Sequence, residues 1–98
     1  MTIEKSINGG TATLAIVGRL DTQTAPELEK ELDEIFAGLQ DLTLDMSGLA
    51  YISSAGLRVI LKAQKIMNKQ GAMRLTGVSD SIMEVFDITG FLDILTIE

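Results

Sequence analysis

The stretch Asp45-Met-Ser-Gly-Leu-Ala-Tyr-Ile-Ser-Ser-Ala-Gly-Leu-Arg58 spans the change from a strand to a helix. Apolar and polar residues alternate up to Met46, which predicts the strand, and helical spacing of apolar residues begins after Ser54. Two serine hydroxyls should therefore lie beside the unpaired N–H groups and the positive dipole end of a helix. A phosphate on either serine would meet hydrogen-bond donors there.

The rest of the chain predicts short elements without linkers or repeats. Thr2–Ile7 and Thr11–Val17 are predicted strands, and Asn8-Gly9-Gly10 between them is a strong hairpin signal. Thr24-Ala-Pro-Glu27 matches a capping box at the start of a helix. The later predicted elements are the end of that helix near Leu39, a strand over Leu42–Met46, a helix from Ser53 or Ser54 to about Gln70 stopped by Gly71, a strand over Ala72–Thr76, a helix from Ser79 or Ser81 to Thr89-Gly90, and a strand over Ile94–Ile97.

The resulting order is β-β-α-β-α-β-α-β, which predicts one α/β domain over residues 1–98. Strands separated by helices imply a mixed, mostly parallel sheet with an N-terminal hairpin and helices covering the sheet. Function in such sheets gathers at the carboxyl ends of the strands. We therefore expect Asp21, Asp45, Ser53 and Ser54 to share one surface region.

Composition excludes several classes of function. The chain has no histidine and no cysteine, so a Ser-His-Asp triad, thiolate chemistry and the usual zinc sites are impossible. The formal net charge of −6 disfavours nucleic acid and anionic membranes as partners. No apolar run is long enough for a membrane span, and the N-terminus lacks signal-peptide features, so we expect a cytoplasmic protein without membrane insertion. No cofactor is predicted.

Three segments resemble the STAS family, named for sulfate transporters and anti-sigma factor antagonists. Ile52-Ser-Ser-Ala-Gly-Leu57 resembles the phosphorylation motif of the anti-sigma factor antagonists. Gly18-Arg-Leu-Asp-Thr-Gln-Thr-Ala25 resembles the turn before the family's first helix, and Leu44-Asp-Met-Ser-Gly-Leu49 resembles the strand leading into the switch loop. The motif register places the phosphoacceptor at Ser54, with Ser53 as second choice, because Ser53 stands where the family frequently has Asp.

The resemblance implies a partner-switching regulator that performs no chemistry itself. Such a protein binds an anti-sigma factor that is also a GHKL-type serine kinase, which frees the sigma factor. Phosphorylation at Ser54 would break the complex, and a serine phosphatase would reset it. The residues expected at the partner surface are Asp21, Asp45, Ser53, Ser54, Ala55, Gly56, Arg58 and Lys62.

Each of these residues also has a purely structural interpretation. Ser53 or Ser54 could serve only as an N-cap, worth about 1 kcal/mol. Asp21 and Asp45 could tighten turns, bind a partner or hold Mg²⁺. Gly56 could reflect close helix packing or the approach of a partner's backbone. The basic face formed by Arg58, Lys62, Lys65 and Lys69 could be solvated or contact an acidic partner, and Arg58 could fold back on a phosphate at Ser54.

Three other functions remain open from the sequence. A STAS protein could be a docking subunit of a stress-signalling or membrane transport complex without a phosphorylation cycle. A small hydrolase with Ser54 as nucleophile is disfavoured, because histidine and a Gly-x-Ser-x-Gly elbow are both absent. A purely structural adaptor would show no modification at all.

Overall fold

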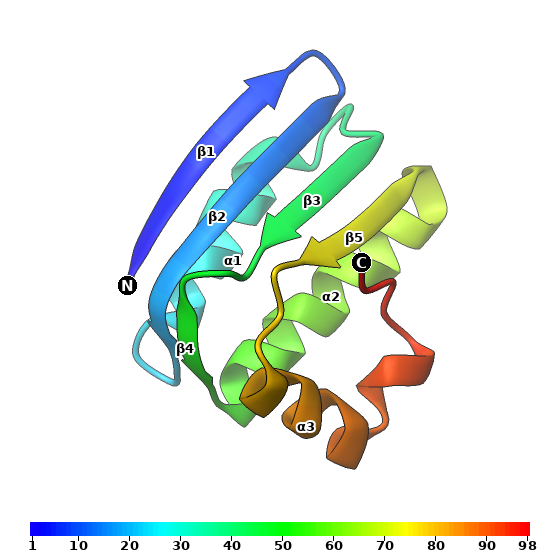
Figure 1. Ribbon diagram of the computed structural model, residues 1–98. Helices are drawn as coiled ribbons and strands as arrows, with labels where there is room; N and C mark the ends of the chain where they lie inside the picture. Colours follow the sequence, from blue (N-terminus) through cyan, green and yellow to red (C-terminus); the bar gives the residue numbers. More distant parts are fainter.

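An antiparallel hairpin begins the chain and supplies the central strand of the sheet (Figure 1). Its turn is Gly9-Gly10, where the sequence predicts it, and Asn8 pairs with Thr11. The computed structural model describes all residues from Met1 to Glu98. The strands are β1 (Thr2–Asn8), β2 (Thr11–Leu20), β3 (Asp41–Asp45), β4 (Leu49–Ile52) and β5 (Ala72–Thr76).

The sheet has the order β1-β2-β3-β5, with β4 also paired to β2. All pairings except that of β1 with β2 are parallel. The helices are α1 (Ala25–Ile35), α2 (Ser54–Gln70) and α3 (Asp80–Thr89), followed by a 3₁₀ turn at Phe91–Asp93. The structure confirms the predicted fold class, a mixed and mostly parallel α/β sheet with an N-terminal hairpin.

The core lies between the sheet and the helices α1 and α2, which run behind the sheet in Figure 1. Alternate residues of β2, β3 and β5 face it because side chains alternate across a strand. Burying these apolar side chains, at about 25 cal/mol per Å² of apolar surface, drives the helices onto the sheet. The fully buried residues with the largest side chains are Phe86, Leu14, Ile16, Leu20, Leu28, Leu32, Leu42, Leu44, Met46, Ile60, Met67 and Leu75.

Strand β4 is absent from the sequence prediction, which has no element between the strand ending at Met46 and the helix beginning at Ser53 or Ser54. Leu49 and Ile52 are buried while the two residues between them are exposed, so four residues do not alternate as a strand pattern requires. The strand forms because β2 extends beyond β3, as far as Leu20, and its end needs a hydrogen-bonding partner. This pairing also explains why β2 ends at Leu20 rather than at the predicted Val17.

The predicted last strand, Ile94–Ile97, is reduced to one bridge between Leu75 and Ile97. Two backbone hydrogen bonds hold it, from Leu75 N–H to the Thr96 carbonyl and from Glu98 N–H to the Leu75 carbonyl. The 3₁₀ turn at Phe91–Asp93 occupies the residues just before this bridge, so too few residues remain for a longer strand pairing.

Gly71 ends α2, as predicted, but for a different physical reason. The prediction relied on the left-handed conformation that glycine favours at helix ends, whereas the backbone at Gly71 is extended, with φ 175°. Glycine is needed there because the chain passes very close to Gln40. A Cβ at this position would overlap the carbonyl oxygen of Gln40 and lie 2.6 Å from its carbonyl carbon.

We expect Gly71→Ala to lower the free energy of unfolding by about 3 kcal/mol, because backbone atoms must move to admit the methyl group. Urea denaturation followed by circular dichroism measures this change. Gly10→Ala is the matched control, since a Cβ on Gly10 would meet its nearest neighbour at an ordinary 3.4 Å. Equal stability of the two variants would contradict the close approach at Gly71.

Candidate functional site

The first turn of α2 is fastened to the end of β2. The N–H of Ser53 donates to the carbonyl of Leu20 over 2.9 Å, and the first intrahelical bond runs from Leu57 N–H to the Ser53 carbonyl. Ser53 is the N-cap residue, with extended backbone angles (φ −100°, ψ 175°). Ser54 is therefore the first helical residue, and the N–H groups of the first turn have no intrahelical acceptor.

The two serines differ in accessibility. Ser54 is exposed, whereas the Ser53 hydroxyl oxygen is buried and has no hydrogen-bond partner within the chain. Ser53 also makes no side-chain cap bond to the helix. A modifying enzyme can therefore reach the hydroxyl of Ser54 but not that of Ser53 in this conformation.

Gly56 serves the packing of the helix. It is buried, and a Cβ there would lie 2.7 Å from Cγ of Leu20 and 3.0 Å from Cγ1 of Ile52. The absence of a side chain brings the first turn of α2 directly onto the ends of β2 and β4. Of the two interpretations of Gly56, close helix packing accounts for what the structure places around it.

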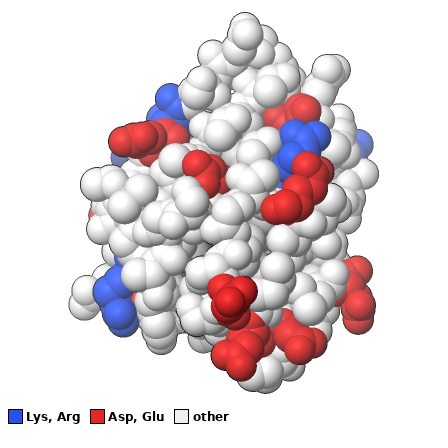
Figure 2. Space-filling view, viewed as in Figure 1, with Lys and Arg blue, Asp and Glu red and all other residues white.

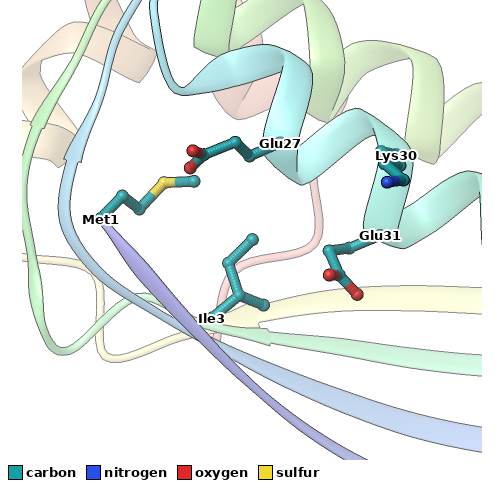
Figure 3. Close-up of a pocket in the computed structure, with 5 residues that line it drawn as sticks. All are labelled: Met1, Ile3, Glu27, Lys30 and Glu31. Carbon is teal, nitrogen blue, oxygen red and sulfur yellow. The ribbon is translucent and has the colours of Figure 1, made fainter.

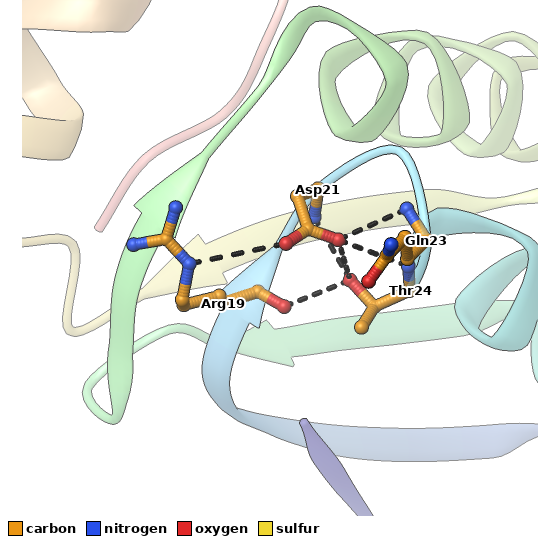
Figure 4. Close-up of polar contacts among 4 residues, drawn as sticks. All are labelled: Arg19, Asp21, Gln23 and Thr24. Carbon is orange, nitrogen blue, oxygen red and sulfur yellow. Dashed lines mark hydrogen bonds and ion pairs between the residues drawn. The ribbon is translucent and has the colours of Figure 1, made fainter.

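Asp21 forms the turn that starts α1 (Figure 4). Its Oδ1 accepts hydrogen bonds from the N–H groups of Gln23, at 3.0 Å, and Thr24, at 3.1 Å. These bonds, above all that from Thr24, hold the pKa of the Asp21 carboxyl below its ordinary value of 3.8, and Arg19, 3.8 Å away, adds to the effect. The turn-forming interpretation of Asp21 thus has a direct structural basis.

The predicted capping box at Thr24 does not form. Thr24 has helical backbone angles (φ −98°, ψ −21°), and its side chain makes no cap bond to the helix. Its hydroxyl instead accepts from Asp21 N–H and donates to the carbonyl of Arg19, each over 2.8 Å (Figure 4). The carboxylate of Asp21 stabilises the turn before the helix, and the N–H groups of Ala25 and Glu27 donate to the backbone carbonyls of Asp21 and Thr24.

The structure brings Asp21, Ser53 and Ser54 together but leaves Asp45 apart from them. Asp45 pairs with Ala15 in the middle of β2, whereas Leu20, just before Asp21, pairs with Ile52. Ala15 and Leu20 are five residues apart along β2, which corresponds to roughly 16 Å, so Asp45 lies far from the end of the strand where Asp21 follows. Asp45 accepts bonds from the backbone and the hydroxyl of Ser47, and these lower its pKa. No cluster of three or more carboxylates is placed to hold a metal ion.

Lys62 links α2 to α1. Its Nζ lies 3.1 Å from Oδ1 of Asp33 and 3.3 Å from Oε2 of Glu29. The hydrogen bond to Asp33, followed by that to Glu29, raises the pKa of Lys62 above its ordinary value. The ammonium that the sequence assigned to the partner surface is therefore already paired within the chain.

A groove of about 230 Å³ lies between α1 and α2, next to Ser54. Arg58, one turn after Ser54, is exposed on its wall and forms no ion pair or hydrogen bond through its side chain. Sequence reasoning found Ala55 and Arg58 but missed the α1 side, because no local pattern shows which helix packs beside α2. The lining residues are Thr22, Ala25, Pro26, Glu29, Ala55, Arg58 and Val59.

A larger hollow of about 290 Å³ lies between β1 and α1, away from these residues (Figure 3). Met1 and Ile3 of the strand side face Glu27, Lys30 and Glu31 of the helix. None of the predicted site residues lines it, so its size does not make it the candidate site.

Surface charge is unevenly distributed (Figure 2). Acidic side chains gather at the end of the molecule that α3 forms, where Asp80, Glu84 and Asp87 lie. No Lys or Arg follows Arg74 in the sequence.

None of the helices combines the length and the apolar character needed to cross a membrane.

Comparison with known proteins identifies the family of the chain. The STAS domain family matches residues 2–98. The anti-sigma-B factor antagonist of Bacillus subtilis (strain 168) is 34% identical over 83 residues, covering 84% of this chain and 76% of that protein. The chain belongs to the STAS family of anti-sigma factor antagonists. The family resemblance expected from the three sequence motifs is thereby confirmed.

Solved STAS structures share the fold of this protein. An anti-sigma factor antagonist from Mycobacterium paratuberculosis has a TM-score of 0.88 at 20% identity, covering 98% of this chain and 83% of that chain. SpoIIAA has a TM-score of 0.79 in its unphosphorylated form, at 13% identity, covering 99% of this chain and 87% of that chain. Its phosphorylated form has a TM-score of 0.78 at 14% identity, covering 99% and 91%.

We expect Asp21→Asn to lower the melting temperature of this STAS protein at pH 7. A carboxyl whose pKa is lowered on folding stabilises the folded state above its ordinary pKa and loses this effect as the pH falls. The difference between wild type and variant should therefore shrink below about pH 4. Thermal unfolding from pH 2.5 to pH 7 measures it.

Asp87→Asn is the control for that series. Asp87 is exposed in the last turn of α3, and its side chain makes no hydrogen bond or ion pair. Removing a negative charge from a helix C-terminus should leave the melting temperature at pH 7 unchanged or slightly raised. A loss equal to that of Asp21→Asn would show that net charge, not the turn, is responsible.

Proposed function

We propose that this protein binds an anti-sigma factor that is also a GHKL-type serine kinase, and that phosphorylation of Ser54 ends this binding. While unmodified, it holds the anti-sigma factor and leaves the sigma factor free. A serine phosphatase restores the unmodified form. One observation carries the proposal: the hydroxyl in the motif register, at Ser54, is exposed on the first residue of α2.

The surroundings of Ser54 suit a phosphate without any change of fold. The N–H groups before Leu57 lack intrahelical acceptors, and the dipole end of a helix favours an anion. Phosphoserine adds about −1.5 to −2 charge. The phosphate is therefore tolerated locally, and its effect must arise at the surface that a partner contacts. SpoIIAA, which shares the fold, has been solved in a phosphorylated form.

At an interface, the same phosphate is unfavourable for two reasons. It adds bulk where a partner packs, and it brings negative charge that must be desolvated when the partner docks. A loss of about 3 kcal/mol weakens binding more than a hundredfold. The antagonist thus acts as ligand and substrate, and the kinase and phosphatase carry out the chemistry.

We expect Ser54→Ala to stay bound to the anti-sigma factor kinase when ATP is present, whereas wild type is released. Ser54→Asp should bind at least tenfold more weakly than wild type, because it introduces part of the phosphate's charge. Isothermal titration calorimetry measures the affinities. Intact-mass measurement after incubation with kinase and ATP should show one added phosphate on wild type and none on Ser54→Ala.

Ser53→Ala is the matched control, one residue away. Its hydroxyl is buried and makes no cap bond, so this variant should fold, bind and accept one phosphate like wild type. Phosphate found on Ser53 rather than on Ser54 would refute the assigned residue. Equal affinity of wild type and Ser54→Asp would refute the role of charge.

A further inference from the structure

We propose that the groove between α1 and α2 receives an apolar side chain of the anti-sigma factor, next to a carboxylate of that partner that pairs with Arg58. We further propose that phosphoserine at position 54 competes for Arg58 and so removes the carboxylate's partner. This inference rests on the proposed function. It names the chemistry of the docking contact and the residue through which the phosphate acts.

The lining of the groove suits an apolar side chain. Ala25 and Pro26 of α1 and Ala55 and Val59 of α2 give the groove an apolar part beside the polar side chains that also line it. Its volume of about 230 Å³ lies below the range typical of small-molecule sites, which begins near 300 Å³. One protruding side chain fits such a groove better than a cofactor does.

The charges at the groove select an acidic neighbour for that side chain. Glu29 on the α1 wall pairs with Lys62 at 3.3 Å, and Lys62 also pairs with Asp33 at 3.1 Å, so one ammonium serves two carboxylates. Arg58 on the α2 wall has no partner within the chain. Arg58 is therefore the one charged group lining the groove that has no partner, and a carboxylate of the anti-sigma factor complements it.

Ser54 and Arg58 are four residues apart on one helix, so their Cβ atoms lie about 5–6 Å apart. Helical side chains lean toward the N-terminus, which directs the long side chain of Arg58 toward Ser54. A phosphate there carries more charge than a carboxylate and accepts two parallel hydrogen bonds from a guanidinium. Arg58 would pair with it inside the chain and no longer be available to the partner.

Competition predicts that the effects of the phosphate and of Arg58 are not additive. Four proteins test this: wild type and Arg58→Gln, each unmodified and each made by chemical synthesis with phosphoserine at position 54. Calorimetric titration with the anti-sigma factor gives the four affinities. We expect Arg58→Gln to weaken the unmodified protein about tenfold and the phosphorylated protein less than twofold.

Two further variants test the groove and the specificity of the charge. Ala55→Gln fills the groove with an uncharged side chain and should weaken binding about tenfold without changing the melting temperature. Lys65→Gln removes an exposed charge farther along the same helix and should leave the affinity unchanged. Unchanged affinity of Ala55→Gln would overturn the groove as the docking site.

The outcomes separate this inference from the proposed function. If phosphoserine at position 54 leaves the affinity of wild type unchanged, the proposed function fails. If phosphorylation weakens binding but Arg58→Gln has no effect, or the same effect in both forms, the proposed function stands and the role of Arg58 is overturned.

Discussion

The hydrogen bond from Ser53 N–H to the Leu20 carbonyl is the contact on which the site depends. It fixes the start of α2 at the end of the central strand. Strand β4 makes this possible because it carries the chain along β2 up to that point. Gly56 then lets the first turn of α2 rest directly on Leu20 and Ile52. The position of Ser54 is thus set by the sheet and the core, not by a loop that could move.

The same anchoring explains how two turns far apart in sequence form one surface. Leu20 ends β2, and Asp21 follows it with a carboxylate-capped turn that starts α1. Both helices therefore begin at the same end of β2, and the groove lies between their first turns. Lys62 joins them one turn deeper by pairing with Glu29 and Asp33. Ion pairs at exposed positions contribute little to stability, so their importance here lies in orientation.

Local patterns predicted the hairpin and the helices, because each depends on residues close in sequence, and the alternation of strands and helices predicted the parallel sheet. They could not predict β4 or the role of Lys62, since both depend on what packs beside them. Leu49–Ile52 lacks strand alternation and forms a strand only because β2 extends beside it. The motif indicated Ser54, and its exposure accords with that choice. Asp45, expected at the same place, lies elsewhere because β3 ends beside the middle of β2.

A switch built on this geometry needs no conformational change in the protein that carries it. The helix start already offers hydrogen-bond donors to an anion, so the phosphate does not strain the fold. The two states of the switch differ in the surface charge beside the groove, where Arg58 is the one basic side chain in the lining. A phosphate at Ser54 adds about −1.5 to −2 charge, which Arg58 alone does not neutralise, so the surface beside the groove becomes more negative. An added repulsive charge separates two binding states more sharply than the loss of a single contact would.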